Sequence, residues 1–171
     1  MEDRRQAWKD STWQIHPRLN VPELNPKAVQ FAVLDSDPVG QFKKKLLQNR
    51  ERFRKEIEAE KEPLPRELLK KAQMTATWNS LFRAVHGDQV YLLAPESNPK
   101  ESLTRGTLVS SNSPPGRKWF TTKVEYLENA LTCWCVPTDV SVGKSAEIEL
   151  AKNNRFNIQR TYHELIEEGQ S

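Results

Sequence analysis

A chain of 171 residues suits one domain, or one domain with an appendage, and buries enough apolar surface to fold without disulfide staples. Two cysteines are too few for a secreted disulfide scaffold, the first residues are too charged for a signal peptide, and no apolar run approaches the roughly 20 residues of a membrane span. The net charge of +3 comes from a basic excess in residues 1–75, too weak by itself to indicate nucleic acid, so we expect a cytoplasmic protein without membrane contact.

Residues 1–36 are expected to form an extended N-terminal arm. Three prolines recur at short intervals, and each lacks an amide donor and turns the preceding residue away from helical conformation. Trp8 and Trp13 stand among mostly polar residues, and a free tail has little use for two indoles. We therefore expect the arm to be pinned at its apolar residues, on its own domain or on another chain. Packing on its own domain is the preferred alternative, because tryptophan is usually buried.

The remaining residues, 37–171, are expected to form one domain that opens with a helical hairpin over 38–86. Asp37 is a suitable N-cap and Pro38 suits the first helical position. The first helix should reach about Glu62, and a second helix should follow closely and run antiparallel to it. The residues expected to face the core are Phe42, Leu46, Phe53 and Ile57 on the first helix, and Leu68, Leu69, Ala72, Ala76, Leu81, Phe82 and Val85 on the second.

A sheet is predicted over residues 89–160, where the hydrophobic period shortens to that of strands. Most connectors are too short for parallel crossovers, so the sheet should be mainly antiparallel. Residues 160–168 should form a short C-terminal helix. The expected class is therefore α+β, with the arm and the hairpin packed on the sheet. The predicted strands are 89–94, 106–111, 118–127, 131–137, 139–150 and 156–159.

Cys133 and Cys135 suggest redox or metal chemistry at first sight. On a strand they point to the same face, about 6.6 Å apart along the chain, which disfavours a mutual disulfide. The three histidines are scattered, so a zinc site lacks its remaining ligands. Trp134 and Val136 point to the opposite face. We expect a strand buried on both faces, with cysteine serving as a small apolar residue.

Two further motifs fail on spacing. The Gly-Lys-Ser at 143–145 lacks the glycine that a phosphate-binding loop needs five positions earlier, where Thr138 stands, and a strand pattern follows where a helix is required. Glu149 and Lys152 lie three apart, on opposite faces of a strand, which does not fit a metal-dependent nuclease. No set of nucleophile, acid and base is recognisable, so no catalytic residue, cofactor or metal ligand is assigned.

The first helix carries the preferred candidate site. Three lysines crowd its N-terminal end, where the helix dipole disfavours positive charge, so they serve a partner or form a solvated face. The preferred function is a non-catalytic accessory protein that binds another protein through its arm and this helix. The expected partner-binding residues are Trp8, Trp13, Lys43, Lys44, Lys45, Arg50 and Arg54.

The alternative function is nucleic-acid binding by an accessory protein, and a hydrolase such as a nuclease comes third. Aromatic and basic side chains on one sheet surface can stack and hold single strands. The alternative needs Trp119 open to solvent, whereas an indole packed under the hairpin is the preferred placement. The residues expected on this surface are Arg117, Lys118, Trp119 and Lys123. The lysines at 43–45 would contribute to the same binding.

Overall fold

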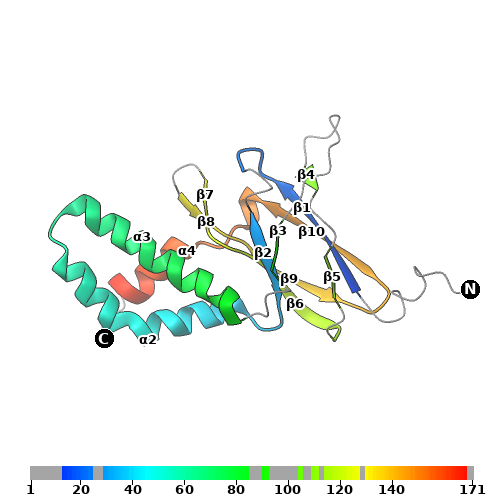
Figure 1. Ribbon diagram of the computed structural model, residues 1–171, viewed down its shortest axis with the longest axis horizontal. Helices are drawn as coiled ribbons and strands as arrows, with labels where there is room; N and C mark the ends of the chain where they lie inside the picture. The colour runs from blue at the N-terminus through cyan, green and yellow to red at the C-terminus, as the bar shows by residue number, and fades with distance from the viewer. Residues whose placement is uncertain are drawn as a thin grey trace, which may run out of the picture.

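The computed structural model describes residues 13–24, 29–84, 90–92, 104–105, 109–111, 114–127 and 130–168. Helices and strands are segregated, with the long helices at one end of the molecule and the sheets at the other (Figure 1). All strand pairs among the described residues are antiparallel except one. The predicted α+β class and the mainly antiparallel sheet are confirmed.

A central antiparallel sheet separates two apolar cores. Its strands, in spatial order, are β3 (Val90–Leu92), β2 (Gln30–Leu34), β6 (Gly116–Thr122) and β9 (Cys135–Val140). Along β2, Phe31 and Val33 enter one core, and Ala32 and Leu34 enter the other. A strand covered on both faces accepts an uninterrupted apolar run, which is why this segment shows no polar alternation.

The second sheet covers one face of the first. Its strands are β10 (Ser145–Ala151), β1 (Trp13–Asn20), β4 (Thr104–Arg105) and β5 (Val109–Ser111). β1 pairs in parallel with β10, from Gln14 opposite Ser145 to Asn20 opposite Ala151. Alternate residues of β1 are buried between the two sheets. The segment expected to be an arm thus supplies one strand to each sheet, β1 and β2, and both strands pack within the same chain.

Helices cover the other face of the central sheet. They are α2 (Pro38–Ala59), α3 (Pro63–Asn79) and the 3₁₀ segment η2 (Ser80–Ala84). The predicted start is confirmed, because the Asp37 side chain accepts a hydrogen bond from the Val39 amide (3.0 Å) and Pro38 occupies the first turn. The hairpin turn falls slightly earlier than predicted, because Pro63 begins α3 instead of ending α2. Within the described ranges, no helix combines the length and apolar character that crossing a bilayer requires.

Three predicted strands are divided in the structure. Residues 118–127 supply the end of β6 and all of β7, and residues 131–137 supply parts of β8 and β9. The small antiparallel sheet so formed consists of β7 (Glu125–Leu127) and β8 (Ala130–Thr132). The Val124 amide donates to Asn79 Oδ1 on α3 (3.1 Å). In a continuous strand this amide would instead donate to a neighbouring strand. A tight turn with Gly143 at φ 76° likewise separates β9 from β10.

The predicted strand at 156–159 is wrong. Phe156 makes only an isolated bridge with Cys133, and the Asn157 side chain accepts a hydrogen bond from the Arg160 amide (2.9 Å). That cap starts a helix instead of a strand. The segments after β10 are η4 (Lys152–Asn154), α4 (Ile158–Tyr162) and the π-helical η5 (His163–Glu167). The predicted short C-terminal helix is confirmed.

Candidate functional site

The outward face of α3 is apolar. Residues four apart lie on one side of a helix, and four such residues face solvent: Leu64, Leu68, Ala72 and Ala76, here called the outer stripe. Leu64 is 71% exposed and Leu68 is 56% exposed. On a helix packed to a core, the leucines normally occupy the inner side. α3 therefore presents to solvent a face of the kind that proteins usually bury.

The prediction that Leu68, Ala72 and Ala76 face the core is wrong. The buried side of α3 instead carries Met74 and Trp78 together with two polar residues, Gln73 and Thr77. Those two are satisfied by hydrogen bonds, which removes the penalty of burying them.

The Gln73 side chain has partners on two other elements, α2 and α4. Its Nε2 donates to the Phe53 carbonyl (3.2 Å) and to Glu56 Oε2 (3.2 Å), and its Oε1 accepts from the Tyr162 hydroxyl (2.5 Å). The Thr77 hydroxyl donates to the Gln73 carbonyl (2.7 Å). This network joins α2, α3 and α4, so the orientation of α3 is fixed by contacts far apart in sequence.

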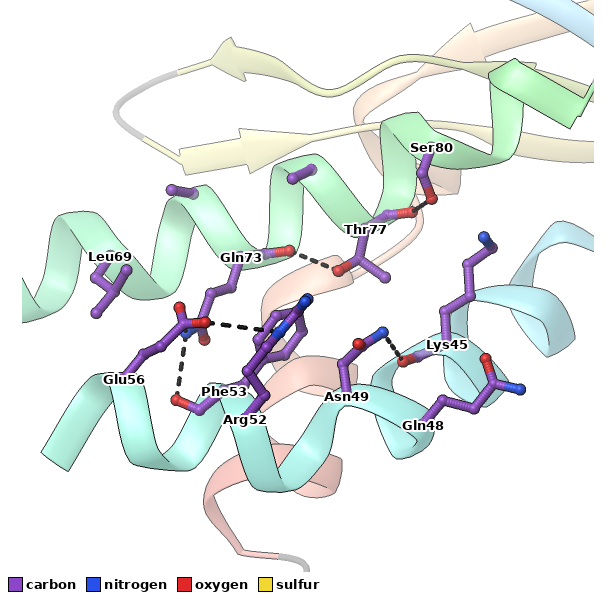
Figure 2. A pocket seen from close by; sticks show the side chains of 12 residues that line it. Lys45, Gln48, Asn49, Arg52, Phe53, Glu56, Leu69, Gln73, Thr77 and Ser80 are labelled. Atoms are coloured by element: carbon purple, nitrogen blue, oxygen red, sulfur yellow. Dashed lines mark hydrogen bonds and ion pairs between the residues drawn. The ribbon is translucent and has the colours of Figure 1, made fainter.

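A groove of ≈ 430 Å³ runs between α2 and α3, beside the outer stripe (Figure 2). On the α3 side it is lined by three apolar residues, Leu69, Ala72 and Ala76, and by the polar residues Gln73, Thr77 and Ser80. Its α2 wall is polar and consists of Lys45, Gln48, Asn49, Arg52 and Glu56. The ring of Phe53 lies between the two walls. The groove thus combines apolar residues on the α3 side with charged residues on the α2 side.

The charged residues of the α2 wall, Lys45, Arg52 and Glu56, sum to a net charge of +1. Figure 2 shows Lys45 and Arg52 reaching from α2 toward α3. The Arg52 guanidinium lies over the Phe53 ring, 5.2 Å from its centroid, and Arg52 Nε is 3.6 Å from Glu56 Oε1. Glu56 also accepts the hydrogen bond from Gln73, so the carboxylate of this wall is already engaged.

The other predicted partner-binding residues on α2 do not share one surface. Lys43 and Lys44 are exposed, whereas Arg50 and Arg54 are half-buried. Arg54 Nε donates to the Ile166 carbonyl (2.6 Å), which ties the last helical segment to α2. Arg54 therefore holds the fold together, and Lys45 is the member of the predicted set that lines the groove.

The four residues proposed for nucleic-acid binding point in different directions. Lys118 is 4% exposed and forms an ion pair with Asp35, on the face of β6 that packs against Trp13. Trp119 is half-buried on the opposite face, where the helices lie. Arg117 is exposed and its Nε lies 2.8 Å from Asp139 Oδ1. Lys123 Nζ is 5.8 Å from the centroid of the Phe82 ring, and the four residues do not form one open surface.

The two tryptophans expected to bind a partner have separate outcomes. Trp13 is 1% exposed and belongs to the core between the two sheets. It therefore packs within its own chain. Trp8 lies outside the described residues.

The cysteine and Gly-Lys-Ser segments show no assembled chemistry. Cys133 and Cys135 are free thiols that pack toward the helices, while Trp134 packs between the sheets. Burial raises the pKa of both thiols, which keeps them protonated. Among the residues that the structure describes, no group of three or more His, Cys, Asp or Glu could hold a metal ion. The segment 143–145 lies in a turn followed by β10, without the helix that would bind phosphate.

Sequence reasoning did not identify the outer stripe or the groove as a site. A signal was present, because the second helix carries two apolar stripes, the outer stripe and a second one formed by Met74, Trp78 and Phe82. One helix can turn only one side to a core, so a second stripe indicates a second contact. No family model matches this chain, and no curated protein or solved structure is significantly similar to it.

Proposed function

We propose that this protein is a non-catalytic binding domain that docks another protein on its helical hairpin. The observation that carries the proposal is the exposure of Leu64 and Leu68 on the outer stripe, next to a groove lined in part by Leu69, Ala72 and Ala76. Single exposed leucines are ordinary on soluble domains. A stripe that runs along three turns of one helix and borders a groove is the kind of patch that marks an interaction site.

Burying the leucines of the outer stripe can supply the binding free energy of a protein interface. Removing a leucine side chain from water contributes about 1.5–3 kcal/mol, so the two leucines together can dominate binding. The surface is also rigid, because the Trp78 indole on α3 donates to the Thr122 carbonyl of the central sheet (2.8 Å). A partner therefore does not have to order the helix, and less of its binding energy is lost.

The hairpin replaces the arm as the expected docking element. Trp13 is enclosed in the core, whereas the leucines of the outer stripe are accessible. The lysines at the start of α2 remain part of the proposal through Lys45, which borders the groove.

The test is an affinity capture from the source cell with nuclease treatment, comparing three proteins. Changing Leu64→Glu together with Leu68→Glu should remove the partners that wild type retains. Leu47→Glu is the matched control, since Leu47 is 52% exposed on α2 and does not line the groove. All three should unfold at similar temperatures, because exposed changes usually alter stability by about 0.5 kcal/mol. Partners kept equally by all three proteins would refute docking on the hairpin.

A further inference from the structure

We infer that the groove between α2 and α3 accepts an amphipathic helix with acidic residues along one flank. This inference rests on the proposed function and specifies the partner. It depends on three features of the hairpin: the shape of the groove, the charges on its α2 wall and the absence of a matching charge pattern on a second copy of α3.

The shape favours a helix as the occupant. Extended peptides bind by adding main-chain hydrogen bonds to a sheet edge, and α2 and α3 have no such edge because helices satisfy their own backbone groups. Two antiparallel helices leave between them a channel that a third helix can fill with its side chains. Ala72 and Ala76 are small, so a third helix can approach the α3 wall closely, while Leu68 can cover its apolar side.

The charges specify one flank of that helix. Lys45 and Arg52 are seven residues apart, which places them two turns or about 10.5 Å apart along the same side of α2. Gln48 lies between them, and Glu56 lies beyond, where it pairs with Arg52 and accepts a hydrogen bond from Gln73. The three charged residues of this wall, Lys45, Arg52 and Glu56, therefore leave a net charge of +1. Lys43 and Lys44 add to the positive potential at the same end of α2. A complementary helix would carry carboxylates about seven residues apart, facing α2.

The α3 helix of a second copy fits the apolar stripe but not the charges. In an antiparallel pair of α3 helices, Leu64 would face Ala76 and Leu68 would face Ala72, which alternates large with small. On α3, however, Glu67 already lies 3.1 Å from its own Lys70. The copy would bring no free carboxylate in the described part of α3 to Lys45 and Arg52. The charge pattern therefore favours a different, acidic partner.

The test is a selection from a displayed library of helices about 20 residues long. Their apolar positions are fixed as leucine and alanine, and their flanking positions are randomised among glutamate, glutamine and lysine. The targets are wild type, the double variant Lys45→Glu with Arg52→Glu, and a matched control with the same charge change outside the groove. The control is Lys55→Glu with Lys61→Glu, two exposed positions that do not line the groove and lie away from the lysines at the start of α2. Thermal melting verifies that each target is folded.

Wild type and the control should enrich glutamate at two flank positions seven apart, and the groove variant should enrich lysine there. A helix selected on wild type should bind the groove variant about tenfold or more weakly, with a loss that shrinks as salt is added. Enrichment of lysine on wild type, or a preference unchanged in the groove variant, overturns the inference.

Two results separate this inference from the proposed function. Selected helices that lose binding with Leu68→Glu but show no charge preference overturn the acidic flank and leave docking on the hairpin standing. A wild-type dimer in sedimentation that Leu68→Glu dissociates, with no helix enriched, assigns the stripe to a second copy and also overturns the acidic flank. If Leu68→Glu changes neither selection nor sedimentation, both proposals fail.

Discussion

In this protein, burial more than residue type decides whether a side chain is available for binding or chemistry. In the run Gly116–Phe120 the sequence suggests a basic aromatic surface, yet Lys118 is enclosed and paired with Asp35 while Trp119 faces the other way. The same holds for the two cysteines, whose spacing suggests redox or metal chemistry. Their environment is apolar, so their chemistry is suppressed.

Both cysteines should resist alkylation in the folded protein. Burial raises the pKa of Cys135 to about 12, aided by the negative charge of Asp37, and burial also raises the pKa of Cys133. At about pH 8 the reactive thiolate is then a very small fraction of either group. Iodoacetamide should label neither cysteine in native buffer and both in guanidinium chloride, as counted by mass spectrometry. Native labelling at the denatured rate would show that the thiols are accessible.

At the scale of elements, the sequence determines where helices start better than which side they bury. Asp37 and Pro38 act locally, so the start of α2 was predictable. The orientation of α3 depends on Gln73, whose partners lie on α2 and α4. A sequence pattern shows that two apolar stripes exist, but it does not show which one meets the core. The outer stripe could therefore be detected from the sequence but not assigned to solvent.

Arg54 should stabilise the C-terminal segment. Its Nε donates to the Ile166 carbonyl (2.6 Å), and hydrogen bonds from charged groups contribute about 1.5–3 kcal/mol. Arg54→Ala should lower the free energy of unfolding by about that amount in urea titrations. Lys55→Ala is the control, because Lys55 is exposed and pairs only with Glu51 among the described residues. Equal stability of the two variants would mean that Arg54 is only a surface charge.

The contact between the C-terminal segment and α3 should depend on pH. The His163 ring contacts Glu167 and, at 2.8 Å, Glu168, and these hydrogen bonds raise the pKa of His163. Burial raises the pKa of Glu167, but the ammonium of Lys70, 2.5 Å away, and His163 outweigh that effect and lower it. The histidine contribution is full below its ordinary pKa of about 6.5 and is lost as pH rises through the raised value. The Glu167 contribution is present above the ordinary carboxyl pKa and is lost in acid.

The measurement is the melting temperature of wild type and His163→Gln across this range. Wild type should be the more stable protein at about pH 5.5, and the difference should vanish as the histidine loses its proton. Gln159→Ala, a change near the same helix that leaves His163 in place, should show a difference independent of pH. A constant difference between wild type and His163→Gln from acid to alkaline pH would exclude the histidine as its source.

At the scale of the whole molecule, the parallel pairing of β1 with β10 joins segments far apart in sequence. Only the short strands β7 and β8 separate β6 from its antiparallel neighbour β9 along the chain, so antiparallel pairing in this region was predictable. Gln14 and Ser145, by contrast, are 131 residues apart, and no local pattern reports such a partner. The presence of two tryptophans among polar residues did indicate that the N-terminal segment is pinned by apolar residues. Its role as a strand inside the sheet could only come from the structure.

Loss of β1 contacts should therefore affect folding before it affects binding. Trp13 fills the core between the two sheets, and replacing a buried aromatic residue by alanine costs about 3–5 kcal/mol, because the cavity cannot fully collapse. Trp13→Ala should unfold at a clearly lower urea concentration than wild type. Gln14→Ala, the next residue on the half-buried outer face of the same strand, should change stability by about 0.5 kcal/mol. If Trp13→Ala instead kept full stability and lost only a partner, the N-terminal segment would be a docking arm and not a strand of the core.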